Sequence, residues 1–94
     1  MNLPKDILDF IEKKFLDTDT ILDHLERLNQ YLDEMDVKES RDRIIRSILF
    51  LTAANEDLFR QYLEMTKLDY RDILYLAEYE NDKQVRNFLN PISD

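Results

Sequence analysis

The chain contains no glycine among its 94 residues, although glycine makes up about 7% of an average protein. Glycine is the residue that most readily adopts a positive φ and lets the backbone approach a ligand closely. Its absence removes the glycine-rich loops in which backbone amides surround phosphate groups. Because the apolar residues also recur at helical rather than alternating spacing, we expect an all-α protein without a nucleotide site of the usual kinds.

The length and composition predict a single globular domain spanning residues 1–94. A chain of this size buries roughly 60% of its unfolded surface, so it needs no disulfide or metal to fold. Apolar residues make up 44% of the chain and charged residues 36%, the latter well above the usual quarter. There is no cysteine, which fits a reducing compartment. No apolar run is long enough for a signal peptide or a membrane span, and we expect a cytoplasmic protein with no membrane contact.

The net charge of -8 is unevenly distributed, because residues 1–35 alone carry -5. An acidic chain without a basic stripe is a poor candidate for binding nucleic acid, which is held largely through neutralised phosphates. The densest basic group is interleaved with acidic residues and consists of Lys38, Arg41, Arg43 and Arg46. We interpret this group as forming salt bridges with the acidic N-terminal third rather than as a phosphate site.

One segment is apolar on almost every side of a helix. Residues 44–54 read IIRSILFLTAA, in which only three residues are not apolar, and such a helix must be surrounded by other elements. We therefore predict a compact bundle of about five or six helical segments around a central helix over about 40–54. Ile48 and Leu51 are expected to be buried, and replacing either with alanine should cost roughly 2–5 kcal/mol. Phe50 is expected to face away from the main contacts.

Capping residues and breakers mark the other helices. Expected helix starts lie near Pro4, after the polar run at 17–20, at 36–40, at Asn55, at Asp69 and at Asp82. Asp36 followed by Glu39 has the character of a capping box for the third helix. Asn55, followed by two acids, favours a break over an uninterrupted helix to Thr66.

The C-terminal part of the chain predicts a last short helix and a tail. This helix would begin at Asp82 and carry Val85, Phe88 and Leu89. It would end at Asn90, because proline disfavours helical geometry in the residue before it. Residues 91–94 would then form a loose tail.

No group of residues has the pattern of a catalytic or metal site. His24 is the only histidine and lies at the edge of the apolar face of the second helix, so we interpret it as a packing residue. The ligand spacings of zinc and di-iron sites are absent, and the polar run at 17–20 lacks the glycine of a calcium loop. We expect no enzyme activity, no cofactor, no metal and no small-molecule substrate.

Three aromatic residues lie outside the densest apolar faces. In the predicted fifth helix, Tyr75 and Tyr79 are one turn apart on roughly the opposite side from the apolar stripe. Tyrosines in such places serve as partner anchors, since the ring buries a large area while the hydroxyl keeps a hydrogen bond. The alternative is boundary packing between two layers. Phe50 raises the same question, and pairing with a second copy would cover all three residues.

The leading hypothesis is a non-enzymatic helical protein-interaction domain that forms a homodimer, with Tyr75, Tyr79 and Phe50 as contact residues. The alternative is an acidic antagonist, of the immunity-protein or nucleic-acid-mimicking kind, whose N-terminal carboxylates bind a basic partner protein. A third possibility, a small hydrolase or metal-dependent enzyme, requires a deep pocket that joins His24 with carboxylates from at least two helices.

Overall fold

The computed structural model describes residues 1–92, and within them five α-helices form an all-α bundle, as predicted. In chain order the elements are α1 (Lys5–Lys14), α2 (Thr18–Glu34), the 3-10 turn η1 (Lys38–Ser40), α3 (Arg41–Thr52), α4 (Glu56–Leu68), α5 (Tyr70–Glu78) and the short strands β1 (Tyr79–Glu80) and β2 (Lys83–Gln84). Among these residues, no helix is both long and apolar enough to cross a bilayer.

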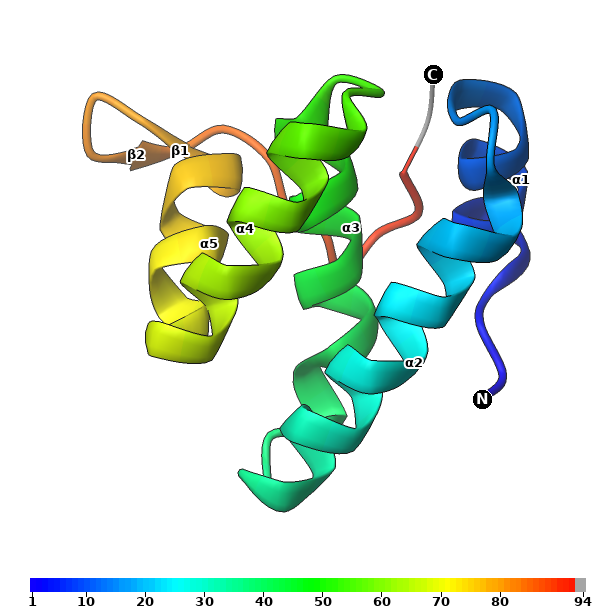
Figure 1. Ribbon diagram of the computed structural model, residues 1–94. Helices are drawn as coiled ribbons and strands as arrows, with labels where there is room; N and C mark the ends of the chain where they lie inside the picture. Colours follow the sequence, from blue (N-terminus) through cyan, green and yellow to red (C-terminus); the bar gives the residue numbers. More distant parts are fainter. Residues whose placement is uncertain (93–94) are drawn as a thin grey trace.

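Helix α3 lies at the centre of the bundle and contacts every other α-helix. Figure 1 shows α4 and α5 on one side of α3, and α1 and α2 on the other. Six consecutive residues of α3, 44–49, are buried, so the prediction of a central apolar helix is confirmed. Leu51 is only partly buried, contrary to expectation, although Thr52 in the same turn of α3 is fully buried.

Side-chain caps begin three of the helices where the sequence predicts. Asp17 caps α2 by accepting a hydrogen bond from the backbone N–H of Thr20 at 3.1 Å. Asn55 and Asp69 cap α4 and α5 in the same way. Each cap satisfies an N–H that has no partner inside the helix. The local polar residues therefore determine these boundaries.

The two junctions on either side of α3 contain residues other than glycine that have positive φ values. Ala53 and Ala54, at φ 48° and 66°, end α3, so the helix breaks before Asn55 rather than continuing to Thr66. Asp36, at φ 60°, follows the end of α2 and is not the cap of the next helix. The predicted capping box is wrong here, because the chain first needs a left-handed residue to leave α2 and then a 3-10 turn to enter α3.

A hairpin replaces the start of the predicted last helix. Asn81 and Asp82 have φ values of 52° and 62° and connect β1 to β2, which pair antiparallel with Tyr79 opposite Gln84. A two-residue hairpin turn requires positive φ at both positions, and asparagine and aspartate tolerate it best after glycine. Asp82 is therefore a turn residue, and the expectation that it caps a helix is wrong.

The residues after the hairpin form a strap, residues 85–92, instead of a helix. The strap contains one turn, in which the backbone N–H of Asn90 donates to the carbonyl of Asn87 at 3.0 Å. Figure 1 shows it passing behind α3 and returning between α3 and α1. Phe88 and Ile92 are buried in the core, whereas Val85 and Leu89 are exposed. The backbone N–H of Ile92 donates to the Asp6 carboxylate at 2.9 Å. Of the tail expected to be loose, Ile92 is thus held against α1, and residues 93–94 lie outside the described residues.

Candidate interaction surface

The outer face of α5 and the start of β1 carry two stacked tyrosines. The inner residues Ile73 and Ala77 of α5 are fully buried, while Tyr75 and Leu76 expose nearly half of their surface. Tyr79, predicted to lie in the same helix, is instead the first residue of β1 and is partly buried. Its ring still stacks on that of Tyr75, with centroids 5.0 Å apart and planes at 15°. We call Tyr75, Leu76 and Tyr79 the α5 face.

The hairpin turn holds the tyrosine pair in place. The Tyr75 hydroxyl donates a hydrogen bond to the carboxylate of Asp82. This bond, reinforced by the negative charge of Asp82, raises the pKa of Tyr75 above its ordinary value. The stacked rings are therefore ordered within the monomer, and the β1–β2 hairpin that the sequence did not predict is what orders them.

Phe50 lies against the chain's own strap rather than beside the tyrosines. Its ring centroid is 5.4 Å from that of Phe88, and the guanidinium of Arg86 lies over the ring at 4.4 Å. Arg86 also donates to the carbonyl of Ala77 at 2.8 Å, so it stands between Phe50 and the end of α5. In residues 1–92 no ring contact joins Phe50 to either tyrosine.

A buried ion pair fixes α5 to α3 beneath the α5 face. Arg43 donates to both carboxylate oxygens of Glu78, from Nη2 at 2.6 Å and from Nε at 2.9 Å. Glu78 is fully buried and also accepts the backbone N–H of Phe88 at 2.8 Å. Burial alone would raise the pKa of Glu78, but the hydrogen bonds from Arg43 and Phe88 outweigh it and hold the pKa below its ordinary value.

A second ion pair fixes α1 to α3 in the same manner. Arg46, on the next turn of α3, donates to both oxygens of Asp6 at 2.9 and 3.1 Å. The hydrogen bond from Arg46 is the main reason that the pKa of Asp6 is lowered. The predicted pairing of the basic group with the acidic third thus holds for Arg46. It is wrong for Arg43, whose partner Glu78 comes from the last third of the chain.

Much of the acidic N-terminal third is engaged within the chain. Asp6 pairs with Arg46, Asp9 with Lys5 at 2.7 Å and Asp23 with Arg27 at 2.8 Å. Lys5 and Arg27 are already counted in the net charge of -5, so among these three pairs only Asp6–Arg46 brings a positive charge from outside residues 1–35. The role of this region in binding a basic protein stays a prediction.

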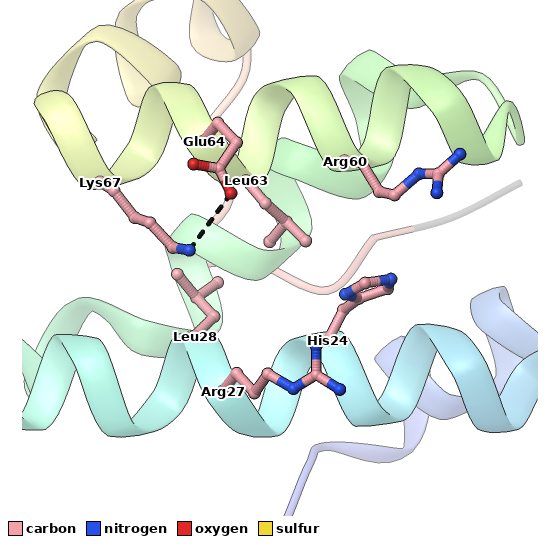
Figure 2. A pocket seen from close by; sticks show the side chains of 7 residues that line it. All are labelled: His24, Arg27, Leu28, Arg60, Leu63, Glu64 and Lys67. Carbon is pink, nitrogen blue, oxygen red and sulfur yellow. Dashed lines mark hydrogen bonds and ion pairs between the residues drawn. The ribbon is translucent and has the colours of Figure 1, made fainter.

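A small pocket lies between α2 and α4 and includes the single histidine. Its volume is about 170 Å³, and it is lined by His24, Arg27, Leu28, Arg60, Leu63, Glu64 and Lys67. Figure 2 shows the nitrogen-bearing side chains of His24, Arg27 and Arg60 toward one end and the Glu64–Lys67 ion pair at the other. Sequence reasoning missed this pocket, because its residues come from two helices, lie 32 to 43 positions apart in the chain and share no motif.

The pocket lacks the groups that the hydrolase hypothesis requires. Glu64 is the only carboxylate in its lining, so carboxylates from two helices do not meet His24 there. His24 packs toward Phe59, with ring centroids 6.1 Å apart. Across residues 1–92 no cluster of three or more histidine, aspartate or glutamate side chains is placed to hold a metal ion.

In comparisons with protein-family models, curated proteins and solved structures, the chain matches none of them. Its function has to be inferred from its own residues and their arrangement.

Proposed function

We propose that this chain is a non-enzymatic helical interaction domain that self-associates through the α5 face. The observation that carries the proposal is the stacked pair of the exposed Tyr75 of α5 and the partly buried Tyr79 of β1, which lies beside the exposed Leu76. Tyrosine is enriched among residues that dominate binding energy. Because Asp82 already orders the Tyr75 ring, little side-chain freedom is left to lose on association.

A second copy of the chain is the partner that we propose, because the α5 face can meet itself across a two-fold axis. An axis perpendicular to α5 pairs the helix antiparallel with its copy, so each residue meets the opposite end of the other helix. The tyrosines and Leu76 then meet at the centre, while charged groups at both ends of α5 keep their partners within the chain, Arg71 with Asp69 at 3.0 Å and Glu80 with Arg86 at 2.9 Å.

A charged residue in the α5 face tests the proposal. Leu76→Asp places an unpaired carboxylate in the proposed interface, whereas Leu16→Asp changes an exposed leucine of the α1–α2 loop on another part of the molecule. We expect the wild type and the Leu16 variant to sediment as dimers at tens of micromolar, and the Leu76 variant to sediment as a monomer with an unchanged helical spectrum. A wild type that stays monomeric throughout this range would refute self-association.

Phe50 is a weaker candidate for the same interface. Its ring is already covered in part by Phe88 and Arg86, so less of its surface is left for a partner. We place Phe50 outside the α5 face and expect Phe50→Ala to leave the dimer intact in the same sedimentation experiment.

An acidic antagonist of a basic protein remains the second candidate. It is supported by the acidic N-terminal third, whose exposed carboxylates include those of Glu12, Asp19 and Glu26. Long-range charge attraction speeds such association and makes it salt-sensitive. Capture of a basic protein from native cytosol that fails steeply with added salt would favour this function over self-association.

A further inference from the structure

The pocket between α2 and α4 combines an apolar floor with cationic side chains. Leu28 and Leu63 are buried and line the pocket from the two helices. Tyr31 of α2 donates a hydrogen bond to the carbonyl of Lys67, which fastens the last turn of α4 to α2. The pocket is therefore a feature of two fixed helices rather than of a loop, and its apolar base can hold the body of a small ligand.

The lining of the pocket is positive in a chain whose net charge is -8. Arg27, Arg60 and Lys67 contribute three cations, against the single carboxylate of Glu64, which pairs with Lys67 at 3.2 Å. The two arginines lie toward the same end as His24, away from that pair (Figure 2). An anionic group is thus best placed at the arginine end.

Both arginines keep hydrogen-bond donors for such a group. Arg27 donates one Nη2 bond to Asp23, and Arg60 donates one Nη2 bond to Asp57. A guanidinium has five N–H donors in a planar fork that matches a carboxylate. No other hydrogen bond from either guanidinium is found within residues 1–92, so each has further donors for a ligand. Both side chains are exposed, and Arg60, which extends along α4 away from Arg27 in Figure 2, has to turn toward the pocket to use them.

We propose that this pocket binds a compact aromatic monocarboxylate as a free small molecule. A cavity of about 150 Å³ holds a benzene ring, and this pocket has about 170 Å³, which suits one ring and excludes a nucleotide. The ring lies on Leu28 and Leu63 beside the imidazole of His24. The carboxylate accepts hydrogen bonds from Arg27 and Arg60.

Titration of the isotope-labelled full chain with benzoate, followed by amide NMR shifts, tests this proposal. We expect saturable shifts at residues of α2 and α4 that line the pocket. Benzamide, a neutral molecule of the same shape, should bind roughly tenfold more weakly, because it lacks the charge that the arginines recognise. Equal binding of benzoate and benzamide, or benzoate shifts scattered over the whole surface, would overturn the proposal.

Single substitutions of the two pocket arginines test where the carboxylate of the ligand binds. Arg27→Gln and Arg60→Gln should each weaken benzoate binding roughly three- to tenfold. Arg71→Gln, which changes an exposed, ion-paired arginine of α5, should have no effect. Unchanged binding in both pocket variants would refute the site.

N-acetylphenylalanine should bind more weakly than benzoate, because this larger molecule exceeds the volume of the pocket. Tighter binding of N-acetylphenylalanine would instead identify a peptide C-terminus as the ligand and overturn the small-acid proposal. These readouts do not depend on whether the chain self-associates.

Discussion

Two arginines on successive turns of α3 organise the polar interior of this protein. Arg43 and Arg46 each hold a carboxylate, Glu78 from α5 and Asp6 from α1, through two hydrogen bonds. Each carboxylate then accepts a backbone N–H from the strap. Buried charges are tolerated only when they are paired and their remaining lone pairs are satisfied. In the described residues no buried side-chain polar atom lacks a partner.

These carboxylates predict how stability depends on pH. The pKa values of Asp6 and Glu78 are lowered in the folded protein, so the unfolded chain takes up their protons first as the pH falls. Their contribution is complete above the ordinary carboxyl pKa of about 4 and is lost as the pH drops through the folded values. We expect the free energy of unfolding in urea to decrease below about pH 5.

Variants of Asp6 and Glu78 test whether these two carboxylates cause the loss of stability in acid. Asp6→Asn and Glu78→Gln should each be less stable at neutral pH and should each show a shallower decrease in acid than the wild type. Glu26→Gln, at an exposed position of α2, should follow the wild-type curve. If the acid decrease were equally steep in all four proteins, other carboxyl groups would have to account for it.

At the scale of elements, residues of α3 that look equivalent in the sequence differ in how deeply their side chains are buried. Ile48 is fully buried, whereas Leu51, three positions later, is only partly buried. Helical spacing places both on one face, but Thr52 in the same turn as Leu51 is fully buried, so the degree of enclosure differs between side chains at the same level of the helix. The strap shows the same effect, because Phe88 is buried and Leu89 is 64% exposed.

Alanine variants of α3 should reflect this difference. Ile48→Ala removes fully enclosed methyl groups and leaves a cavity, so it should cost roughly 2–5 kcal/mol of unfolding free energy. Leu51→Ala should cost less than half of that, since much of its side chain already contacts water. Thermal and urea denaturation measure both; equal losses would mean that the end of α3 is covered as well as its middle.

At the scale of the whole molecule, the strap joins the two ends of the described chain. Ile92 reaches Asp6 across 86 positions of sequence, and Phe88 packs on Phe50 of the central helix. The strap therefore covers the side of α3 that the helices leave open. An all-α bundle of this length would otherwise leave apolar surface of its central helix in water.

Removal of a single strap side chain tests its structural role. Phe88→Ala should destabilise the fold by about 3 kcal/mol or more, as expected for a large buried aromatic side chain. Leu89→Ala, at the neighbouring exposed position, should change stability by less than about 0.5 kcal/mol. Equal and small effects at both positions would show that the strap is not part of the folded core.

The sequence by itself determined the helical class, the central position of α3 and the starts of α2, α4 and α5, because helical period and the caps Asp17, Asn55 and Asp69 act within a few residues. It placed Tyr75 off the apolar stripe for the same reason, whereas Tyr79 lies in β1 and not in the predicted helix. Only the tertiary structure decided the strap, the α2–α4 pocket and the partner of Arg43. Those features depend on contacts between residues that are far apart in the chain, and local propensities carry no information about which distant groups will meet.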